Sequence, residues 1–152
     1  MPAPLAPQKN GGQAEQALGR SRGGFSTKIH VTVDGLGNPL RLDLTAGERH
    51  DILKAHDQIV DLDFDYVIAD RGYGAQAFLD EIIASGAEPV IPPKKNAKAP
   101  HEYDAWRYRE RHLVECFIGK IKHFRRVFSR FDKLARRYLG FLHFTSALIW
   151  LR

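Results

Sequence analysis

The chain has 152 residues, of which 43% are hydrophobic and 27% are charged. This length and composition suit one globular domain and exclude two full-sized ones. No run of 18 apolar residues occurs and the N-terminus lacks the apolar core of a signal peptide, so we expect a cytoplasmic protein without a membrane span. The single cysteine, Cys116, excludes an internal disulfide and a cysteine-based zinc site, and we expect its thiol to be at least half-buried.

The charge is unevenly distributed along the chain. The net charge is +5, but residues 1–100 hold 11 Lys/Arg against 13 Asp/Glu, whereas residues 101–152 hold 12 Lys/Arg against 5 Asp/Glu. A strongly basic C-terminal region suggests contact with a polyanion such as nucleic acid. A solvated helix surface would account for the same pattern.

The N-terminal residues 1–24 consist mostly of Gly, Pro, Gln and Ala, with few side chains that could be buried. Such a segment cannot offset its ordering entropy, so we expect it to be flexible, with a basic piece at residues 19–24. Order is expected to begin at Phe25, and residues 25–152 to form the globular domain.

Alternating apolar and polar residues predict a hairpin after Phe25. The run from Phe25 to Val33 has the period of two that is typical of a strand with one buried face. A turn cluster at residues 34–38 follows, and then a second alternating run through Leu40, Leu42 and Leu44. We expect an antiparallel pair, with Asp34 in the turn and Asp43 facing solvent.

The middle of the chain predicts a strand–helix–strand unit after a helix at about 51–60. Residues 64–69 form a nearly continuous apolar run, as in a strand covered on both faces. A helix with the apolar residues Phe78, Leu79, Ile82 and Ile83 follows, with Gly86 as its stop. Residues 89–92 form a second short strand, so the order implies parallel pairing with a right-handed crossover.

Helical periodicity extends from Glu102 to the end of the chain. One apolar face is formed by Leu113, Phe117, Ile121, Phe124 and Phe128, and a second helix begins near Asp132. Trp106 and Trp150 are expected to be packing residues. The predicted fold class is therefore mixed α/β, or α+β, with helices at the C-terminus.

Asp70 is the first candidate functional residue. It directly follows the predicted buried strand and precedes the glycine-rich turn Asp70-Arg71-Gly72-Tyr73-Gly74. Ligands and metals bind at the C-terminal ends of strands in such sheets, and the glycines let the backbone turn sharply beside the carboxylate. The alternative is an aspartate that caps the next helix.

Glu115 is the second candidate. On a helix, the side chains of Tyr108, Arg111, Glu115 and Lys122 fall on one side, opposite the apolar stripe. A charged face opposite an apolar one is also typical of any amphipathic surface helix. Together with Asp70, Glu115 would form the carboxylate pair that divalent metal chemistry on phosphodiesters requires.

These motifs resemble a known family. The step Asp70-Arg71-Gly72-Tyr73-Gly74 and the spacing Tyr108-x2-Arg111-x3-Glu115-x6-Lys122 are similar to the C-terminal portion of bacterial insertion-sequence DDE transposases, those of the four/five group with the Y-x2-R-x3-E-x6-K signature. The segment from Gly19 through the predicted hairpin resembles these enzymes as well, so the resemblance covers residues 19–152.

The resemblance implies a ribonuclease-H-like fold and DNA cleavage and strand transfer at transposon ends with Mg²⁺ or Mn²⁺. It implies that Asp70 and Glu115 are catalytic and ligate the metal, and that Tyr108, Arg111 and Lys122 contact DNA. Arg125 and Arg126 are further candidates for phosphate contacts. The implied partners are DNA at transposon ends and target, with a homo-oligomer allowed.

One part of the family pattern is missing. The first family aspartate belongs to the first strand, upstream of the hairpin, but residues 1–24 contain no aspartate. The chain therefore resembles a transposase that lacks its first strand, inactive until an upstream transposase segment joins it. The alternative functions are a non-catalytic DNA-binding fragment that regulates the full transposase and a stand-alone ribonuclease-H-like nuclease. A third carboxylate near Asp70 and Glu115 would distinguish catalysis from binding.

Overall fold

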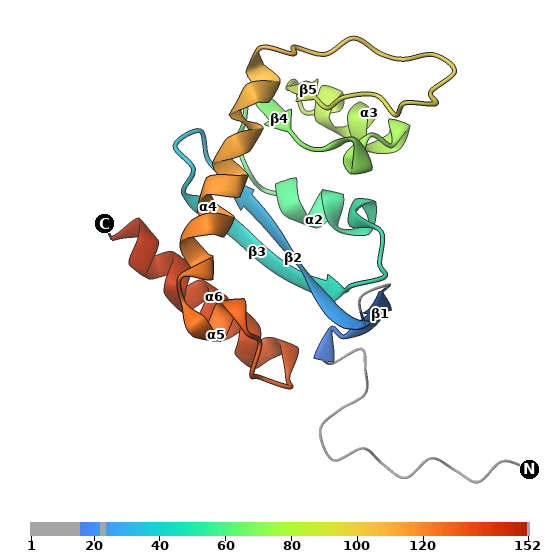
Figure 1. Ribbon diagram of the computed structural model, residues 1–152. Coiled ribbons are helices and arrows are strands. Elements are labelled where there is room, and N and C mark those ends of the chain that lie inside the picture. Colours follow the sequence, from blue (N-terminus) through green and yellow to red (C-terminus); the bar gives the residue numbers. More distant parts are fainter. Residues whose placement is uncertain (1–15, 22–23, 152) are drawn as a thin grey trace, which may run out of the picture.

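The computed structural model describes residues 16–21 and 24–151 (Figure 1). The fold is mixed α/β, as predicted, with one three-stranded antiparallel sheet and one two-stranded parallel sheet. The strands are β1 (Gly19–Ser21), β2 (Gly24–Val33), β3 (Pro39–Ala46), β4 (Tyr66–Ile68) and β5 (Glu88–Val90). The α-helices are α2 (Ala55–Ile59), α3 (Gln76–Ala84), α4 (His112–Lys122), α5 (Arg125–Phe128) and α6 (Ala135–Trp150), with 3₁₀ turns η1 (Asp51–Lys54), η2 (Arg71–Tyr73) and η3 (Arg107–Arg111).

The N-terminal segment is described from residue 16 onward, apart from residues 22–23. Within it, β1 pairs antiparallel with the start of β2, from Gly19 opposite Ser26 to Ser21 opposite Gly24. Sheet structure thus begins before Phe25. The expectation of flexibility for residues 1–15 lies outside the described residues.

The predicted hairpin is confirmed by β2 and β3. The two strands pair antiparallel, from Thr27 opposite Ala46 to Val33 opposite Pro39. In the turn, the Asp34 carboxylate accepts hydrogen bonds from the backbone N–H groups of Leu36 and Asn38, at 2.9 and 2.8 Å. This Asx-type turn fixes the register of the pair because the aspartate holds the chain where it reverses.

The prediction of one solvent-facing side on this hairpin is wrong. His30 is only 3% exposed, and the Thr32 hydroxyl donates to the Gln58 side-chain oxygen at 2.9 Å. Asp43 does not face solvent freely, because its carboxylate lies 2.6 Å from Lys54 Nζ with the side chain 30% exposed. The reason is that the segment 51–59 packs against the polar side of the strands, which strand periodicity cannot indicate.

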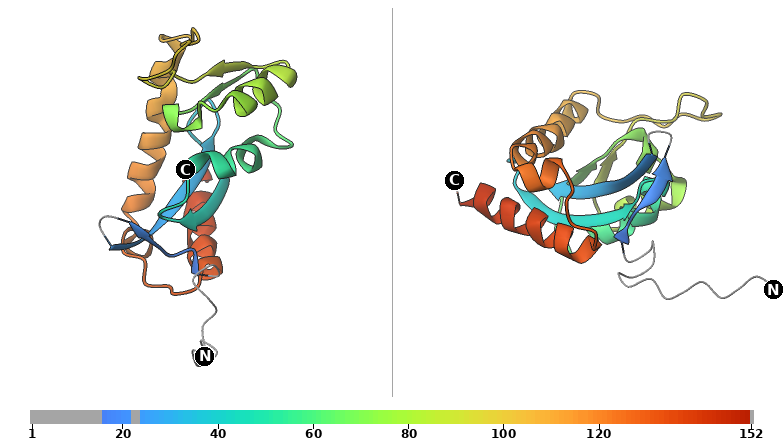
Figure 2. Two further views of the ribbon diagram at one scale, coloured as in Figure 1. Left: turned by 90° about the vertical axis from the view of Figure 1, so that its right-hand side faces the viewer. Right: turned by 60° about the horizontal axis from the view of Figure 1, so that its bottom comes forward.

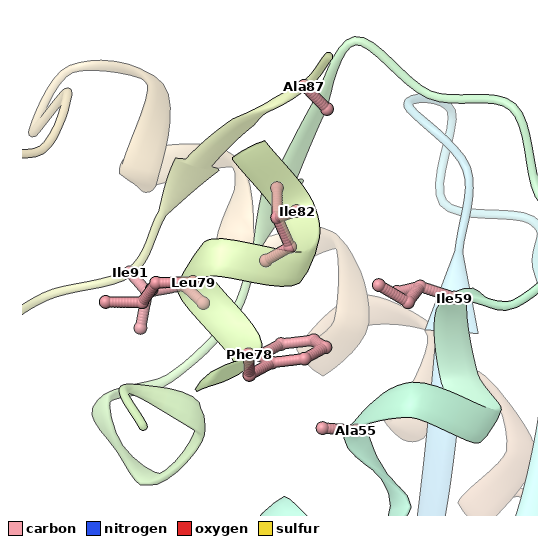
Figure 3. Packing of buried hydrophobic residues seen from close by; sticks show 7 residues of the cluster. All are labelled: Ala55, Ile59, Phe78, Leu79, Ile82, Ala87 and Ile91. Atoms are coloured by element: carbon pink, nitrogen blue, oxygen red, sulfur yellow. The ribbon is translucent and has the colours of Figure 1, made fainter. Parts of the chain in front are cut away.

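The strand–helix–strand unit is confirmed. Strands β4 and β5 pair parallel, with Tyr66 opposite Glu88 and Ile68 opposite Val90. Helix α3 ends before Gly86, whose φ of +85° suits glycine at a helix stop. Figure 3 shows the core of this unit, where side chains of α3 meet those of α2 and the ends of β5. The cluster consists of Ala55, Ile59, Phe78, Leu79, Ile82, Ala87 and Ile91, whereas Ile83 is 58% exposed.

The C-terminal helices form a second core against the hairpin. Phe117 and Ile121 of α4 are 0% and 1% exposed and pack with Leu42 of β3 and Leu142 of α6. The predicted apolar face does not continue to Phe128, which is 71% exposed. Helix α4 ends at Lys122 and the chain bends into α5, so the helical period is interrupted.

Three further expectations for this region are wrong. Residues 102–106 are not helical, and the helical part begins with η3. Trp106 and Trp150 are 71% and 51% exposed, although the Trp150 indole donates to the Pro39 carbonyl at 2.7 Å. Cys116 is exposed because it follows Glu115 on the side of α4 that faces solvent.

The long helix α4 connects the two sheets. Figures 1 and 2 show it running from the β4–β5 sheet along the hairpin toward α5 and α6. It contacts β2, and the preceding turn η3 contacts β4. Within residues 16–21 and 24–151, no helix is long and apolar enough to cross a membrane.

Candidate active site

A cavity of about 640 Å³ lies between the two sheets. Its walls are formed by residues 28–35 of β2 and the following turn, residues 62–70 around β4, parts of η1 and α2, and the start of α4. Over residues 27–33, β2 pairs with β3 on one edge, and no described strand pairs with the other. Strand β4 likewise has β5 as its one described partner.

The prediction that β4 is covered on both faces is wrong. Tyr66, Val67 and Ile68 are half-buried rather than buried, and all three line the cavity. A continuous apolar run indicates a strand built for burial on two sides. The described residues cover only part of that surface.

Asp70 lies at the wall of this cavity, two residues after β4 ends. It precedes η2, and its carboxylate makes no capping hydrogen bond there, so the helix-cap alternative is not supported. Its backbone carbonyl accepts from the Tyr73 N–H at 2.9 Å, which closes the turn. The side chain is 54% exposed and is therefore accessible to a ligand.

Glu115 and Asp70 share one cation. Glu115 lies in the first turn of α4, 61% exposed, and pairs with the guanidinium of Arg111. The other terminal nitrogen of Arg111 lies 3.7 Å from the Asp70 carboxylate. The structure thus brings the two predicted acids, 45 residues apart in sequence, to a common partner.

The remaining predicted site residues lie on η3, α4 and α5. Tyr108 packs edge-on against Tyr103, with ring centroids 5.7 Å apart, and Lys122 is exposed at the end of α4. Arg125 and Arg126 are exposed, and their guanidinium groups lie 5.8 Å and 4.2 Å from the ring centres of Phe131 and Phe141. These four residues make no ion pair with either acid.

Sequence reasoning missed a polar group beneath the Asp70 turn. The His30 imidazole lies 2.8 Å from the Thr45 hydroxyl and 3.4 Å from the Tyr73 hydroxyl. Burial lowers the pKa of His30. Burial, with the charges of Asp51 and Asp70, raises the pKa of Tyr73 to about 12. Both groups are therefore neutral near pH 7 and support the turn through hydrogen bonds.

A second missed contact is the ion pair between Lys28 and Asp51, with 2.9 Å between Nζ and Oδ1. A Cβ atom added to Gly72 would lie 3.6 Å from the Asp51 carboxylate, so this pair lies against the glycine-rich turn. No spacing signal could reveal it, because its members come from different elements. Among the described residues, no group of three His, Cys, Asp or Glu side chains is arranged to hold a metal ion.

Comparison with known proteins identifies the family. The sequence profile described as "Transposase DDE domain" matches residues 3–120. A Brucella ovis protein, "Putative transposase for insertion sequence element IS6501", is 36% identical over 133 residues, which cover 84% of this chain and 100% of that protein. No solved structure matches the chain. Because the profile spans most of the chain, this protein belongs to the transposase DDE domain family.

Proposed function

We propose that this chain is the C-terminal catalytic portion of an insertion-sequence transposase, which cleaves and joins DNA at transposon ends. The observation that carries the proposal is the meeting of Asp70 and Glu115 at Arg111 in a chain of this family. Residues 25–152 would be a ribonuclease-H-like domain that lacks its first strand. The relative described as an insertion-sequence transposase supports the same assignment.

The donor set fits a divalent metal ion in part. Asp70 and Glu115 offer exposed carboxylate oxygens, the hard ligands that Mg²⁺ and Mn²⁺ prefer. A bound ion of this kind activates a water or 3′-hydroxyl nucleophile and stabilises the leaving oxygen. Two carboxylates alone are a sparse set for two ions, and the described residues supply no third one.

The basic residues would hold the DNA backbone. Lys122, Arg125 and Arg126 are exposed, and no carboxylate within residues 16–21 and 24–151 pairs with them, so their charges are available to phosphates. The guanidinium groups of Arg125 and Arg126 lie over the aromatic rings of Phe131 and Phe141, and such cation–π contacts favour these positions of the long side chains. Tyr108 and Arg111 precede Glu115 and would position the phosphodiester beside it.

The third carboxylate would come from an upstream transposase segment that enters the cavity as a strand. Three observations support this partner. The cavity lies between β2 and β4, and residues 27–33 of β2 and the strand β4 each have one edge without a described strand partner. Its walls include the half-buried, apolar side chains of β4. Asp70 and Arg111 line it, so a residue on the inserted strand would arrive beside both.

A nicking assay on a transposon-end duplex with Mg²⁺ or Mn²⁺ tests this function. We expect no cleavage by the chain alone and metal-dependent cleavage by a fusion of the upstream segment to this chain. Asp70→Ala or Glu115→Ala in the fusion should abolish nicking while the circular dichroism spectrum stays unchanged. Undiminished nicking by either variant would overturn the assignment of that acid.

The rival function is a non-catalytic DNA-binding fragment that regulates the complete transposase. The lack of a three-carboxylate cluster in residues 16–21 and 24–151 favours this role for the isolated chain. It predicts that the fusion, too, fails to cleave, and that the isolated chain inhibits an active transposase on the same DNA. Robust cleavage by the chain alone would contradict both the proposed function and the DNA-binding fragment, and would favour a stand-alone nuclease.

A further inference from the structure

Arg111 occupies the space between the two acidic residues of the candidate site. Its guanidinium contacts Glu115 one helical turn ahead and also reaches Asp70 on the separate β4 segment. An ordinary i,i+4 surface pair would explain the first contact. It does not explain the second, because Asp70 belongs to a different segment of the chain, two residues after β4.

Each acid depends on this one cation. Arg111 is the ion-pair partner that the described residues provide for Asp70, and it is likewise the partner of Glu115. Other basic side chains nearby are engaged elsewhere, since Arg107 pairs with Glu88 and Asp104 and lies over the ring of Tyr66. Without Arg111, the two carboxylates would lose the cation that lies between them, and their mutual repulsion would increase.

We propose that Arg111 is an internal counter-cation that a divalent metal ion displaces, and that the displaced guanidinium then binds a DNA phosphate. The inference rests on the proposed function for the position of the metal, but it assigns Arg111 a role of its own. A guanidinium has only donors and cannot ligate a metal, so it and the ion compete for the same two carboxylates. The side chain is 34% exposed, which leaves it room to move to solvent or to DNA.

The exchange would couple metal binding to DNA binding. When both acids are neutralised by the ion, Arg111 loses its partners and regains the ability to form two parallel hydrogen bonds to a phosphate. Linkage requires the coupling to be reciprocal, so DNA that captures Arg111 must also tighten metal binding. This coupling would keep the affinity for the metal ion low until DNA binds.

Titration with Mn²⁺, with the free ion measured by electron paramagnetic resonance, tests the competition without any need for catalysis. The full chain is compared with Arg111→Gln, with Arg107→Gln as a control that removes the same charge from the same turn, and with Asp70→Asn. We expect Arg111→Gln to bind Mn²⁺ about fivefold more tightly or better, because one competing charge near the ion is removed. Arg107→Gln should change the affinity much less.

The outcomes separate this inference from the proposed function. Weaker or unchanged Mn²⁺ binding by Arg111→Gln, with binding abolished by Asp70→Asn, overturns the counter-cation role and leaves the metal site standing. Unchanged binding by Asp70→Asn, or no binding by any variant, overturns the metal site and the inference together.

Fluorescence anisotropy with a labelled duplex tests the second half of the inference. Mn²⁺ should increase the DNA affinity of the unchanged chain severalfold, and the increase should disappear in Arg111→Gln and persist in Arg107→Gln. An equal Mn²⁺ effect in the unchanged chain and in Arg111→Gln would overturn the transfer of Arg111 to phosphate.

Discussion

Arg111 joins Asp70 to Glu115: one guanidinium nitrogen lies 3.7 Å from the Asp70 carboxylate while the other pairs with Glu115. The turn after β4, which carries Asp70, therefore meets η3 at the point where α4, which carries Glu115, begins. This contact is the geometric link between the two motifs that the sequence analysis singled out. Of these three residues, Asp70 and Arg111 line the cavity.

Hydrogen exchange should reveal the open edge of β2. In an antiparallel strand, successive amides point to opposite edges, so over residues 27–33 we expect slow exchange at positions bonded to β3 and fast exchange at the alternate ones. Adding the upstream segment should protect the fast set. Uniform protection of all seven amides in the isolated chain would mean that the edge is already covered.

The salt dependence of DNA binding should identify the phosphate contacts. Each contact to duplex DNA contributes about −0.9 to the slope of log affinity against log salt. Replacing Arg125 and Arg126 by Ala should therefore make the slope shallower by up to about 1.8. The control is the double change of Lys94 and Lys95 to Ala, which removes two exposed charges from the loop after β5. If the control makes the slope equally shallow, DNA binding depends on the overall positive charge of the chain rather than on contacts made by Arg125 and Arg126.

Phe117 and Phe128 belong to the same apolar stripe in the sequence, but their different exposure predicts very different losses of stability when each is truncated to Ala. Phe117 is 0% exposed in the core beneath α4, and Phe117→Ala should lower the free energy of unfolding by about 3–5 kcal/mol. Phe128 is 71% exposed, and Phe128→Ala should change it by less than about 1 kcal/mol. Urea denaturation measures both. Similar losses would mean that α5 packs against the core through Phe128.

The stability of the chain should fall in mild acid because of His30. Burial lowers the folded-state pKa of His30 below its ordinary value of 6.5, so the unfolded chain takes up the proton first. The contribution of His30 to the free energy of unfolding is therefore fully present above about pH 6.5. It is lost as the pH falls toward the lowered folded pKa, with a slope of at most about 1.4 kcal/mol per pH unit. Unfolding curves between pH 7.5 and 5 for the unchanged chain and for His30→Gln measure this loss.

The control for that experiment is His56→Gln. His56 is exposed, and its hydrogen bond to Glu81 raises its pKa, so its contribution has the opposite sign and is lost as the pH rises through the raised value. The His30 variant should be less sensitive to acid than the unchanged chain, and the His56 variant should not be. If His30→Gln keeps the full acid sensitivity, another group is responsible for it.

Interactions between residues close in sequence determine several strands, turns and helix ends of this protein, and the sequence alone therefore predicted them. Alternation with a period of two specified the β2–β3 hairpin, and the turn chemistry of Asp34 specified its register. The apolar run before Asp70 specified a strand, which pairs parallel with β5, and Gly86 specified the end of α3. The resemblance to DDE transposases is confirmed by the matching profile, because motifs depend on residue identity and spacing, which a sequence carries directly. The four/five group and its signature stay predictions.

Tertiary structure decided what lies opposite each surface. Periodicity assigns a face but not its partner, so it could not indicate that His30 is buried, that Lys54 pairs with Asp43, or that Phe128 is exposed after the bend at Lys122. It identified Asp70 and Glu115 separately, from two local motifs. Only the packing of η3 against β4 brought Arg111 between them, because contacts between residues distant in sequence depend on how whole elements are packed.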